Sequence, residues 1–171
     1  MSKPYLFLDV DGVINSLRTP TGPHTEHSVS CGINGTFSIQ IRERVLEWLT
    51  DELPELAEVR WNTTWCSWAN RLADTFGFPQ AEVAAGHTEC PDLFNLAPPW
   101  KYDALLSDWK KDPRPFVWVD DEAISSTSYR AAHDFSPFDR GDTPFLLVEP
   151  NGNWAISDDE IHRINTFLRS H

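Results

Sequence analysis

Two aspartates spaced by two residues follow a short apolar run near the start of the chain. The run is residues 5–8, the aspartates are Asp9 and Asp11, and Gly12 comes next. In an extended strand, residues i and i+2 point to the same side, so both carboxylates are expected to project together beyond the end of the strand. Neighbouring carboxylates repel each other, and one takes up a proton unless a cation lies between them. The pattern therefore indicates metal binding or acid–base chemistry.

A second acidic pair, Asp120 and Asp121, ends the apolar run 116–119 in the same way. Thr63 and Thr64 follow another predicted strand. Ligands of parallel α/β sheets lie beyond the carboxyl ends of the strands, so these side chains are expected to share one site. Four carboxylates at one edge need a hard cation. Mg²⁺ fits, because it prefers oxygen ligands and leaves room in its shell for water and phosphate oxygens.

The elements that position these residues are predicted from the spacing of apolar residues. Strands are expected over residues 5–10, 56–61, 81–85, 116–119 and 144–148, and helices over about 41–53, 65–76 and 101–110 and from 157 onward. Pro54 is expected to end the first helix, and Gly77 the second. The alternation predicts an α/β, Rossmann-like three-layer fold with a mostly parallel central sheet. A chain of 171 residues is expected to form a single domain, 1–171.

A long segment after the first acidic pair, residues 15–38, is rich in Gly, Pro, Ser, Thr and His and shows no helical period. Within it, residues 28–31 and 36–39 flank the turn-forming sequence Gly-Ile-Asn-Gly of residues 32–35, which predicts a β-hairpin. A loop of this length is usually functional. We therefore expect a hairpin flap here that influences substrate specificity.

The composition limits the classes of function. The net charge of −12 argues against nonspecific binding to nucleic acid or to an anionic membrane, because both need basic patches. No stretch approaches the roughly 18 consecutive apolar residues of a membrane span. The three cysteines form no C-x-x-C pair, which fits a reducing compartment, and we expect a cytoplasmic protein.

The clustered side chains have complementary roles in phosphoryl transfer. With Mg²⁺ bound, one carboxylate can attack phosphorus while its neighbour acts as general acid and then general base. Thr63 would donate a hydrogen bond to the transferring phosphoryl group, and Lys101, at a predicted helix start, would neutralise negative charge there. The expected partner is a phosphorylated substrate, either a small molecule or a nucleic-acid end.

These residues lie in four motifs that resemble those of the haloacid dehalogenase-like (HAD) superfamily of aspartate-nucleophile phosphatases. Residues 6–12 read LFLDVDG, where the family has three hydrophobic residues followed by D-x-D-G. Thr63 matches the second motif, Lys101 the third, and the VWVDD of residues 117–121 the fourth. The four motifs occur in the family's order.

The resemblance implies a role for each residue. Asp9 would be the nucleophile that forms an aspartyl phosphate, and Asp11 the general acid/base. Mg²⁺ would be held by Asp9, the backbone carbonyl of Asp11 and Asp120, with Asp121 close by. An acid at Asp11 favours phosphoryl chemistry, because members that act on carbon–halogen bonds generally lack one there. The implied protein is a Mg²⁺-dependent phosphatase, a phosphoric monoester hydrolase, whose flap replaces a cap domain.

A narrower resemblance lies in residues 62–65 (NTTW), 69–72 (ANRL) and 115–122 (PFVWVDDE). These are similar to the small, nearly capless HAD domains of Swiss Army knife RNA-repair proteins. This likeness implies substrates such as nucleotide or nucleic-acid terminal phosphates. Two alternatives stay open: a module that binds phosphate or nucleic-acid ends with little or no turnover, and a phosphotransferase.

Some of the site residues also fit a structural role. Thr63 is suited to cap the helix that follows, in which case Thr64 would be the phosphate-binding residue. Lys101 also fits an ordinary surface lysine whose stem covers apolar surface. The acidic residues 158–160 are expected to be part of a helix cap and not a metal site.

Other residues with chemical potential lie outside the four motifs. Histidines and cysteines occur at loose zinc-like spacing as His24, His27 and Cys31, and as His87 and Cys90. Because this spacing lacks the features of a zinc knuckle, we favour exposed or substrate-facing flap residues over a structural zinc site. Trp65 and Trp68 fall at helical spacing and are expected to belong to the core.

Overall fold

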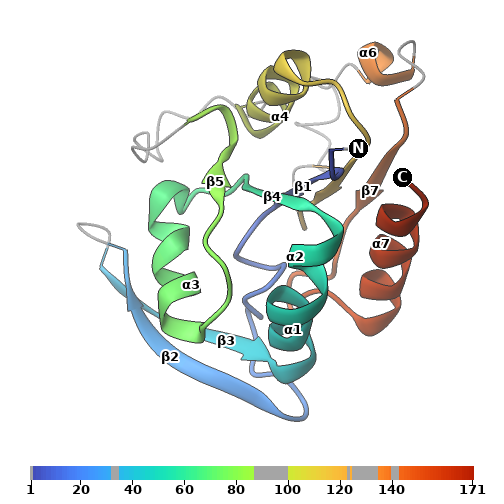
Figure 1. Cartoon of the computed structure of the whole chain (residues 1–171). Coiled ribbons are helices and arrows are strands. Elements are labelled where there is room, and N and C mark those ends of the chain that lie inside the picture. The colour runs from blue at the N-terminus through green and yellow to red at the C-terminus, as the bar shows by residue number, and fades with distance from the viewer. Residues whose placement is uncertain (1, 32–34, 87–99, 123, 125–134, 140–142) are drawn as a thin grey trace.

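A parallel β-sheet forms the centre of the molecule (Figure 1). The computed structural model describes residues 2–31, 35–86, 100–122, 124, 135–139 and 143–171. Within them the sheet has five strands: β1 (Tyr5–Leu8), β4 (Glu58–Trp61), β5 (Glu82–Val83), β6 (Phe116–Val119) and β7 (Phe145–Val148). Their order is β5-β4-β1-β6-β7, so β1 lies in the middle. The predicted α/β, Rossmann-like fold with a parallel sheet is confirmed.

Helices cover both faces of this sheet. They are α1 (Glu43–Glu47), α2 (Leu53–Leu56), α3 (Ala69–Phe76), α4 (Trp100–Lys111), α6 (Ser136–Asp139) and α7 (Asp158–Ser170). Alternate side chains of a strand point to opposite faces, so Leu6 and Leu8 pack in one core with α1, α2, α3 and α7. Tyr5 and Phe7 pack in a second core with α4 and α6. Figure 1 shows α4 and α6 on one side of the sheet and α1, α2 and α7 on the other.

The predicted hairpin is present as two antiparallel strands, β2 (His24–Ser30) and β3 (Thr36–Arg42). Both are longer than predicted. Ile41 was expected to open a helix but lies in β3, and this expectation was wrong. Ile39 and Ile41 are both fully buried whereas Gln40 between them is only half-buried, so the chain still follows the two-residue period of a strand at this point.

Pro54 does not end the helix that follows β3, contrary to the prediction. A π-helical stretch, η2 (Trp48–Glu52), joins α1 to α2, and the Leu53 N–H bonds to the carbonyl of Trp48, five residues back. This widened turn accommodates Pro54, which has no N–H to donate and whose ring would collide with an ordinary α-helical turn. The helix therefore continues to Leu56, and β4 begins only at Glu58.

The other predicted helices lie within a few residues of their expected bounds, whereas the strand predicted over residues 81–85 is limited to β5 (Glu82–Val83). A short 3₁₀ turn, η3 (Cys66–Trp68), leads into α3, which ends at Gly77 in the left-handed conformation with a φ of 84°. A second 3₁₀ turn, η4 (Ala84–Gly86), follows β5. Among the described residues, no helix has the length and apolar character needed to cross a membrane.

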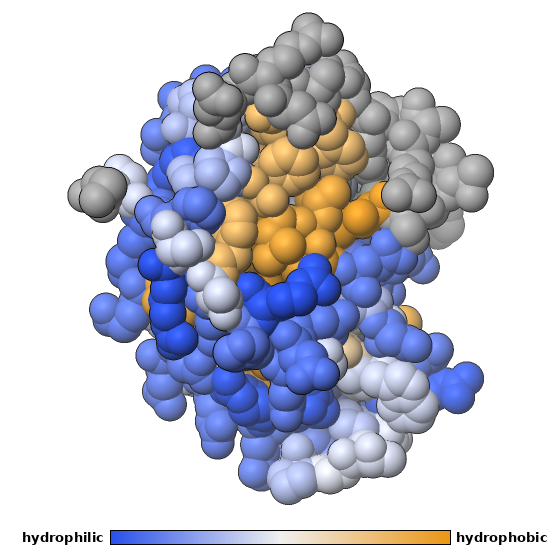
Figure 2. Space-filling view, turned by 90° about the vertical axis from the view of Figure 1, so that its right-hand side faces the viewer, coloured by the Kyte–Doolittle hydropathy of each residue, from blue (hydrophilic) through white to orange (hydrophobic). Residues whose placement is uncertain are grey.

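The edge strand β7 contributes to an apolar surface. Three of its residues, Phe145, Leu146 and Leu147, are only partly buried. This side of the molecule carries an apolar area with a hydrophilic surface below it (Figure 2). Arg163 of α7 donates a hydrogen bond of 3.3 Å to the carbonyl of Leu147, which places a charged side chain against the edge strand. Charges at such positions discourage pairing with another chain.

The N-terminus of α7 offers a direct test of the sequence-based boundary. Ser157 Oγ accepts a bond from the Glu160 N–H, and the Glu160 carboxylate accepts one from the Ser157 N–H at 2.7 Å. We predict that Ser157→Ala lowers the free energy of unfolding by about 1 kcal/mol, because the first turn loses its cap. Urea titration followed by circular dichroism measures this. Ser170→Ala, at the exposed opposite end of the helix, serves as the control and should change stability by less than about 0.5 kcal/mol. Equal effects of the two substitutions would contradict the assignment.

Candidate active site

The ends of three neighbouring strands meet at one edge of the sheet. Leu8 is level with Trp61 in β4 and with Val119 in β6. The pairing continues past the strands, where the Asp9 N–H donates to the Val119 carbonyl at 3.1 Å. Asn62 N–H likewise donates to the Leu8 carbonyl at 3.0 Å. The residues that follow each strand are therefore held side by side, as predicted from the parallel arrangement.

Lys101 lies between the carboxylates of Asp9 and Asp120. Its Nζ is 2.5 Å from Asp9 Oδ2 and 2.6 Å from Asp120 Oδ2, and all three side chains are buried. Burial alone would lower the pKa of Lys101, but the two carboxylates outweigh that effect and raise the pKa, so the ammonium stays charged. The first turn of α4 is fixed beside the sheet, since Asn62 Nδ2 donates to the Lys101 carbonyl at 3.1 Å. Lys101 is thus a buried partner of the cluster and not a surface lysine.

Asp121 completes a cluster of three carboxylates. Asp9, Asp120 and Asp121 each offer an oxygen, and these atoms lie within 4.8 Å of one another. Burial raises the pKa of Asp121 to about 7, with further contributions from the charges of Asp9, Asp120 and Glu122 against a lowering by Lys101. Such a shift is typical of a carboxyl group that is largely buried beside other carboxylates.

The cluster fits a divalent cation in charge and in ligand type. Three carboxylates carry three negative charges and Lys101 offsets one, so two remain to be balanced. The ligands are all oxygen atoms, which is the donor set that Mg²⁺ prefers. Asp9, Asp120 and Asp121 are therefore the side chains that would hold Mg²⁺.

Two glycines form a cradle around the Asp121 carboxylate. A Cβ at Gly12 would lie 2.1 Å from Asp121 Oδ2, and one at Gly152 would lie 2.2 Å from the same atom. Gly12 also has a φ of 74°, which residues with a Cβ rarely adopt. Gly152 belongs to the loop between β7 and α7, and it was missed by the sequence analysis. No local pattern marks it, because its role depends on a contact with a distant strand end.

Asp11 lies outside the carboxylate cluster and has neutral partners of its own. Asn15 Nδ2 donates to Asp11 Oδ1 at 2.7 Å, and Trp65 Nε1 donates to Asp11 Oδ2 at 2.8 Å. The side chain is therefore not a candidate metal ligand, and the predicted ligand from this residue is its backbone carbonyl. The division into a metal-binding group and a separate Asp11 agrees with distinct roles for the two carboxylates of the first motif.

Thr63 is buried in the turn that follows β4, and one of its contacts is that of a capping residue. It is 1% exposed, and its Oγ1 accepts a hydrogen bond of 3.3 Å from the Trp65 N–H, as a turn-capping residue does. A hydroxyl that accepts also keeps its own O–H to donate, so this contact is compatible with phosphate binding. Thr64 is half-buried.

The histidines of the hairpin do not join a metal-binding group. His24 Nδ1 lies 2.9 Å from the Gly22 carbonyl, and the ring of His27 packs edge-on against Phe76 at 5.0 Å. In the part of the chain that the structure describes, the one group of three or more possible metal ligands is the Asp9, Asp120 and Asp121 cluster. The other zinc-like pair, His87 and Cys90, lies outside the described residues.

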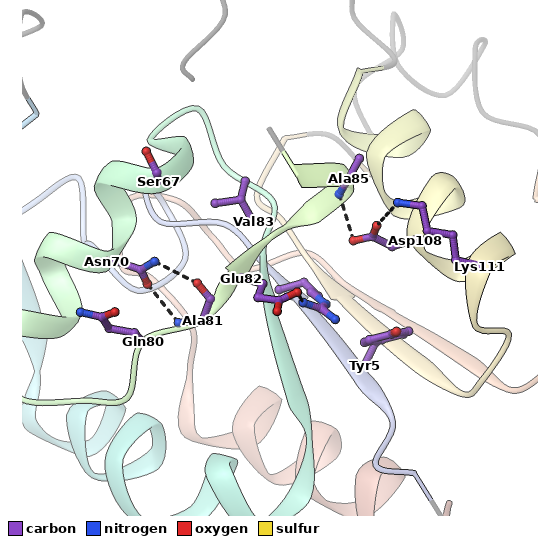
Figure 3. Close-up of a pocket in the computed structure, with 11 residues that line it drawn as sticks. Tyr5, Ser67, Asn70, Gln80, Ala81, Glu82, Val83, Ala85, Asp108 and Lys111 are labelled. Atoms are coloured by element: carbon purple, nitrogen blue, oxygen red, sulfur yellow. Dashed lines mark hydrogen bonds and ion pairs between the residues drawn. The ribbon is translucent and has the colours of Figure 1, made fainter. Parts of the chain in front are cut away.

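A cavity of about 720 Å³ opens beside β5 (Figure 3), and its lining does not include Asp9, Asp120 or Asp121. Tyr5, at the start of β1, lines it, whereas Asp9 follows the end of that strand. Its cationic side chains already have acidic partners: Lys111 lies 3.3 Å from Asp108, and Arg60 pairs with Glu82. The cavity therefore lacks the unshared positive charge that a phosphate site needs.

The glycine cradle predicts that Gly152→Ala weakens Mg²⁺ binding. The added methyl group would displace the Asp121 carboxylate, and changes of this kind next to a metal ligand reduce affinity by roughly 10- to 100-fold. Isothermal titration calorimetry with Mg²⁺ measures the effect. Asn153→Ala, which removes an exposed side chain from the same loop, is the control and should leave the affinity unchanged. An unaltered Mg²⁺ affinity in Gly152→Ala would refute the role of the cradle.

The comparisons with known proteins agree with this geometry. A protein-family model described as "HAD domain in Swiss Army Knife RNA repair proteins" matches residues 5–141. The chain has no match among curated proteins and none among solved structures. The matched span contains both acidic strand ends together with Thr63 and Lys101. HAD proteins are generally phosphatase-type hydrolases. The chain therefore belongs to the family of HAD domains found in Swiss Army Knife RNA repair proteins.

Proposed function

We propose that this protein is a Mg²⁺-dependent phosphatase that hydrolyses phosphate monoesters through an aspartyl phosphate on Asp9. The observation that carries the proposal is the buried Lys101 ammonium, which joins the Asp9 and Asp120 carboxylates beside Asp121. A lysine in this place orients a carboxylate oxygen of Asp9. It also supplies positive charge where a phosphate would bind.

The first step transfers the phosphoryl group to the protein. A carboxylate oxygen of Asp9 attacks phosphorus, the bond from phosphorus to the ester oxygen breaks, and Asp11 gives its proton to the departing alcohol. Thr63 and Lys101 donate hydrogen bonds to the phosphoryl oxygens. Asp9, Asp120 and Asp121 would hold Mg²⁺, which would neutralise negative charge and so lower the repulsion between the anionic nucleophile and the phosphate.

The second step regenerates Asp9. Asp11, now ionised, takes a proton from a water molecule whose oxygen attacks the phosphorus of the aspartyl phosphate. The bond between phosphorus and Asp9 breaks, and inorganic phosphate leaves. The same carboxyl group thus serves as acid and then as base, which requires Asp11 to keep one orientation through both steps.

The substrate is proposed to carry a terminal phosphate on a nucleotide or nucleic-acid end. The family to which the chain belongs supports this class, since its description names RNA repair proteins. The net charge of −12 argues against a nonspecific hold on the rest of a polynucleotide, so recognition would be confined to the terminus.

The nucleophile is tested by Asp9→Asn, which removes the attacking oxygen but keeps the shape of the side chain. We expect hydrolysis of an aryl phosphate with Mg²⁺ to fall by at least roughly 1,000-fold, because no other group can form the acyl phosphate. Release of inorganic phosphate measures this. Asp159→Asn, an exposed aspartate in the first turn of α7, should retain full activity.

A panel of substrates then separates the alternatives. It comprises nucleotides, sugar phosphates and oligonucleotides phosphorylated at the 3′ or 5′ end, each with Mg²⁺. Preferential turnover of oligonucleotide ends supports the proposed substrate class. Phosphate transfer to added alcohols would identify a phosphotransferase, and binding without turnover on every substrate would leave a binding module as the function.

A further inference from the structure

Both carboxylate oxygens of Asp11 are held by neutral hydrogen-bond donors. Asn15 Nδ2 lies 2.7 Å from Oδ1, and Trp65 Nε1 lies 2.8 Å from Oδ2. An indole N–H is only a donor and an amide NH₂ carries no charge, so neither exchanges a proton with the carboxyl group. Held on both sides, the plane of the Asp11 carboxyl group is fixed without adding charge beside the metal-binding cluster.

The hairpin strand β3 supports both donors. The Gln40 N–H donates to Asn15 Oδ1 at 3.0 Å, which directs the amide NH₂ of Asn15 toward Asp11. The ring of Phe37 packs against that of Trp65, with 5.6 Å between their centroids. Phe37 is 43% exposed, whereas Trp65 is 4% exposed, so the hairpin covers the indole from the solvent side. Two residues of one strand thus support the two sides of Asp11.

The backbone next to Trp65 is held in an unfavourable conformation. Cys66 has a φ of 49°, in the left-handed region that residues with a Cβ seldom occupy. The turn is closed by a hydrogen bond of 3.1 Å from the Cys66 N–H to the Thr63 carbonyl. Such conformations persist where the surrounding contacts determine them, and they are concentrated at functional sites. Here the turn carries Thr63 at one end and Trp65 at the other.

We propose that Asn15 and Trp65 are positioning residues that hold Asp11 in the orientation for proton transfer, and that the β2–β3 hairpin acts through them. The inference rests on the proposed phosphatase function. Proton transfer in the transition state depends strongly on the placement of the acid, so a carboxyl group free to rotate would be a poorer catalyst. The hairpin would then be part of the acid–base machinery as well as a flap over the site.

The test compares two substrates that differ in their need for a proton. Nitrophenol leaves as a stable anion, whereas a simple alkyl alcohol must be protonated as it departs. Trp65→Phe keeps a smaller aromatic ring against Phe37 and removes the N–H donor. We expect kcat/KM for the alkyl phosphate to fall by roughly 10- to 100-fold and that for nitrophenyl phosphate to change by less than about threefold.

Matched variants separate positioning from a general structural effect. Trp68→Phe alters a second tryptophan of the same segment whose ring lies 4.0 Å from the Arg71 guanidinium, and both substrates should be turned over as in the wild type. In an Asp11→Asn background, Trp65→Phe should cause no further loss, because the group that it positions no longer carries a proton to give. Asn15→Ala removes the other hydrogen-bond donor to Asp11 and tests the positioning role independently. If Trp65→Phe does not fold, the result for Asn15→Ala decides whether Asp11 is positioned in this way.

Each outcome bears on a defined claim. A loss confined to the alkyl phosphate in Trp65→Phe and Asn15→Ala supports the inference. An equal loss with both substrates, or no loss with either, overturns it while leaving the phosphatase function intact. If the wild type hydrolyses neither substrate, the proposed function fails and the inference fails with it.

Discussion

The contact of the Lys101 ammonium with Asp9 and Asp120 is the interaction on which the rest of the site depends. The parallel sheet forces carboxylates at the ends of β1 and β6 into proximity, and their repulsion would oppose folding without a counter-charge. Lys101 comes from α4, which packs on one face of the sheet, so the packing of this helix places the ammonium group beside the two carboxylates. One positive charge does not balance three carboxylates, and a divalent metal ion would neutralise the remaining negative charge.

The two carboxylates of the first motif are supported by different parts of the fold. Asp9 is held by its backbone bond to β6 and by Lys101 of α4. Asp11 is held by Asn15 and Trp65, which in turn contact β3 of the hairpin. Asp9 and Asp11 lie only two residues apart, yet Asp9 has a charged partner and Asp11 has neutral partners. The two carboxylates thus have different surroundings, which supports the proposal that they have separate roles.

Local sequence patterns predicted much of the fold and most of the side chains that meet at the candidate site. Strand β6 has the predicted bounds. Gly77 ends α3 and Ser157 caps the start of α7, as expected. These features were predictable because each depends on residues that are close together in the sequence. The course of the chain at Pro54 was not predictable, since it depends on a π-helical turn. Gly152 and the hydrogen bond from Trp65 to Asp11 were missed for a similar reason. They arise between segments that are far apart in the sequence, and Trp65 looked like an ordinary core residue.

Asp9 is proposed to receive the phosphoryl group beside a metal ion, and crystals of the protein grown with Mg²⁺ and beryllium fluoride, a mimic of an acyl phosphate, test this. We expect beryllium bonded to a carboxylate oxygen of Asp9, with Thr63 and Lys101 donating to the fluorides and Mg²⁺ held by Asp9, Asp120 and Asp121. Beryllium on a different side chain, or Mg²⁺ bound without Asp9, would contradict this proposal.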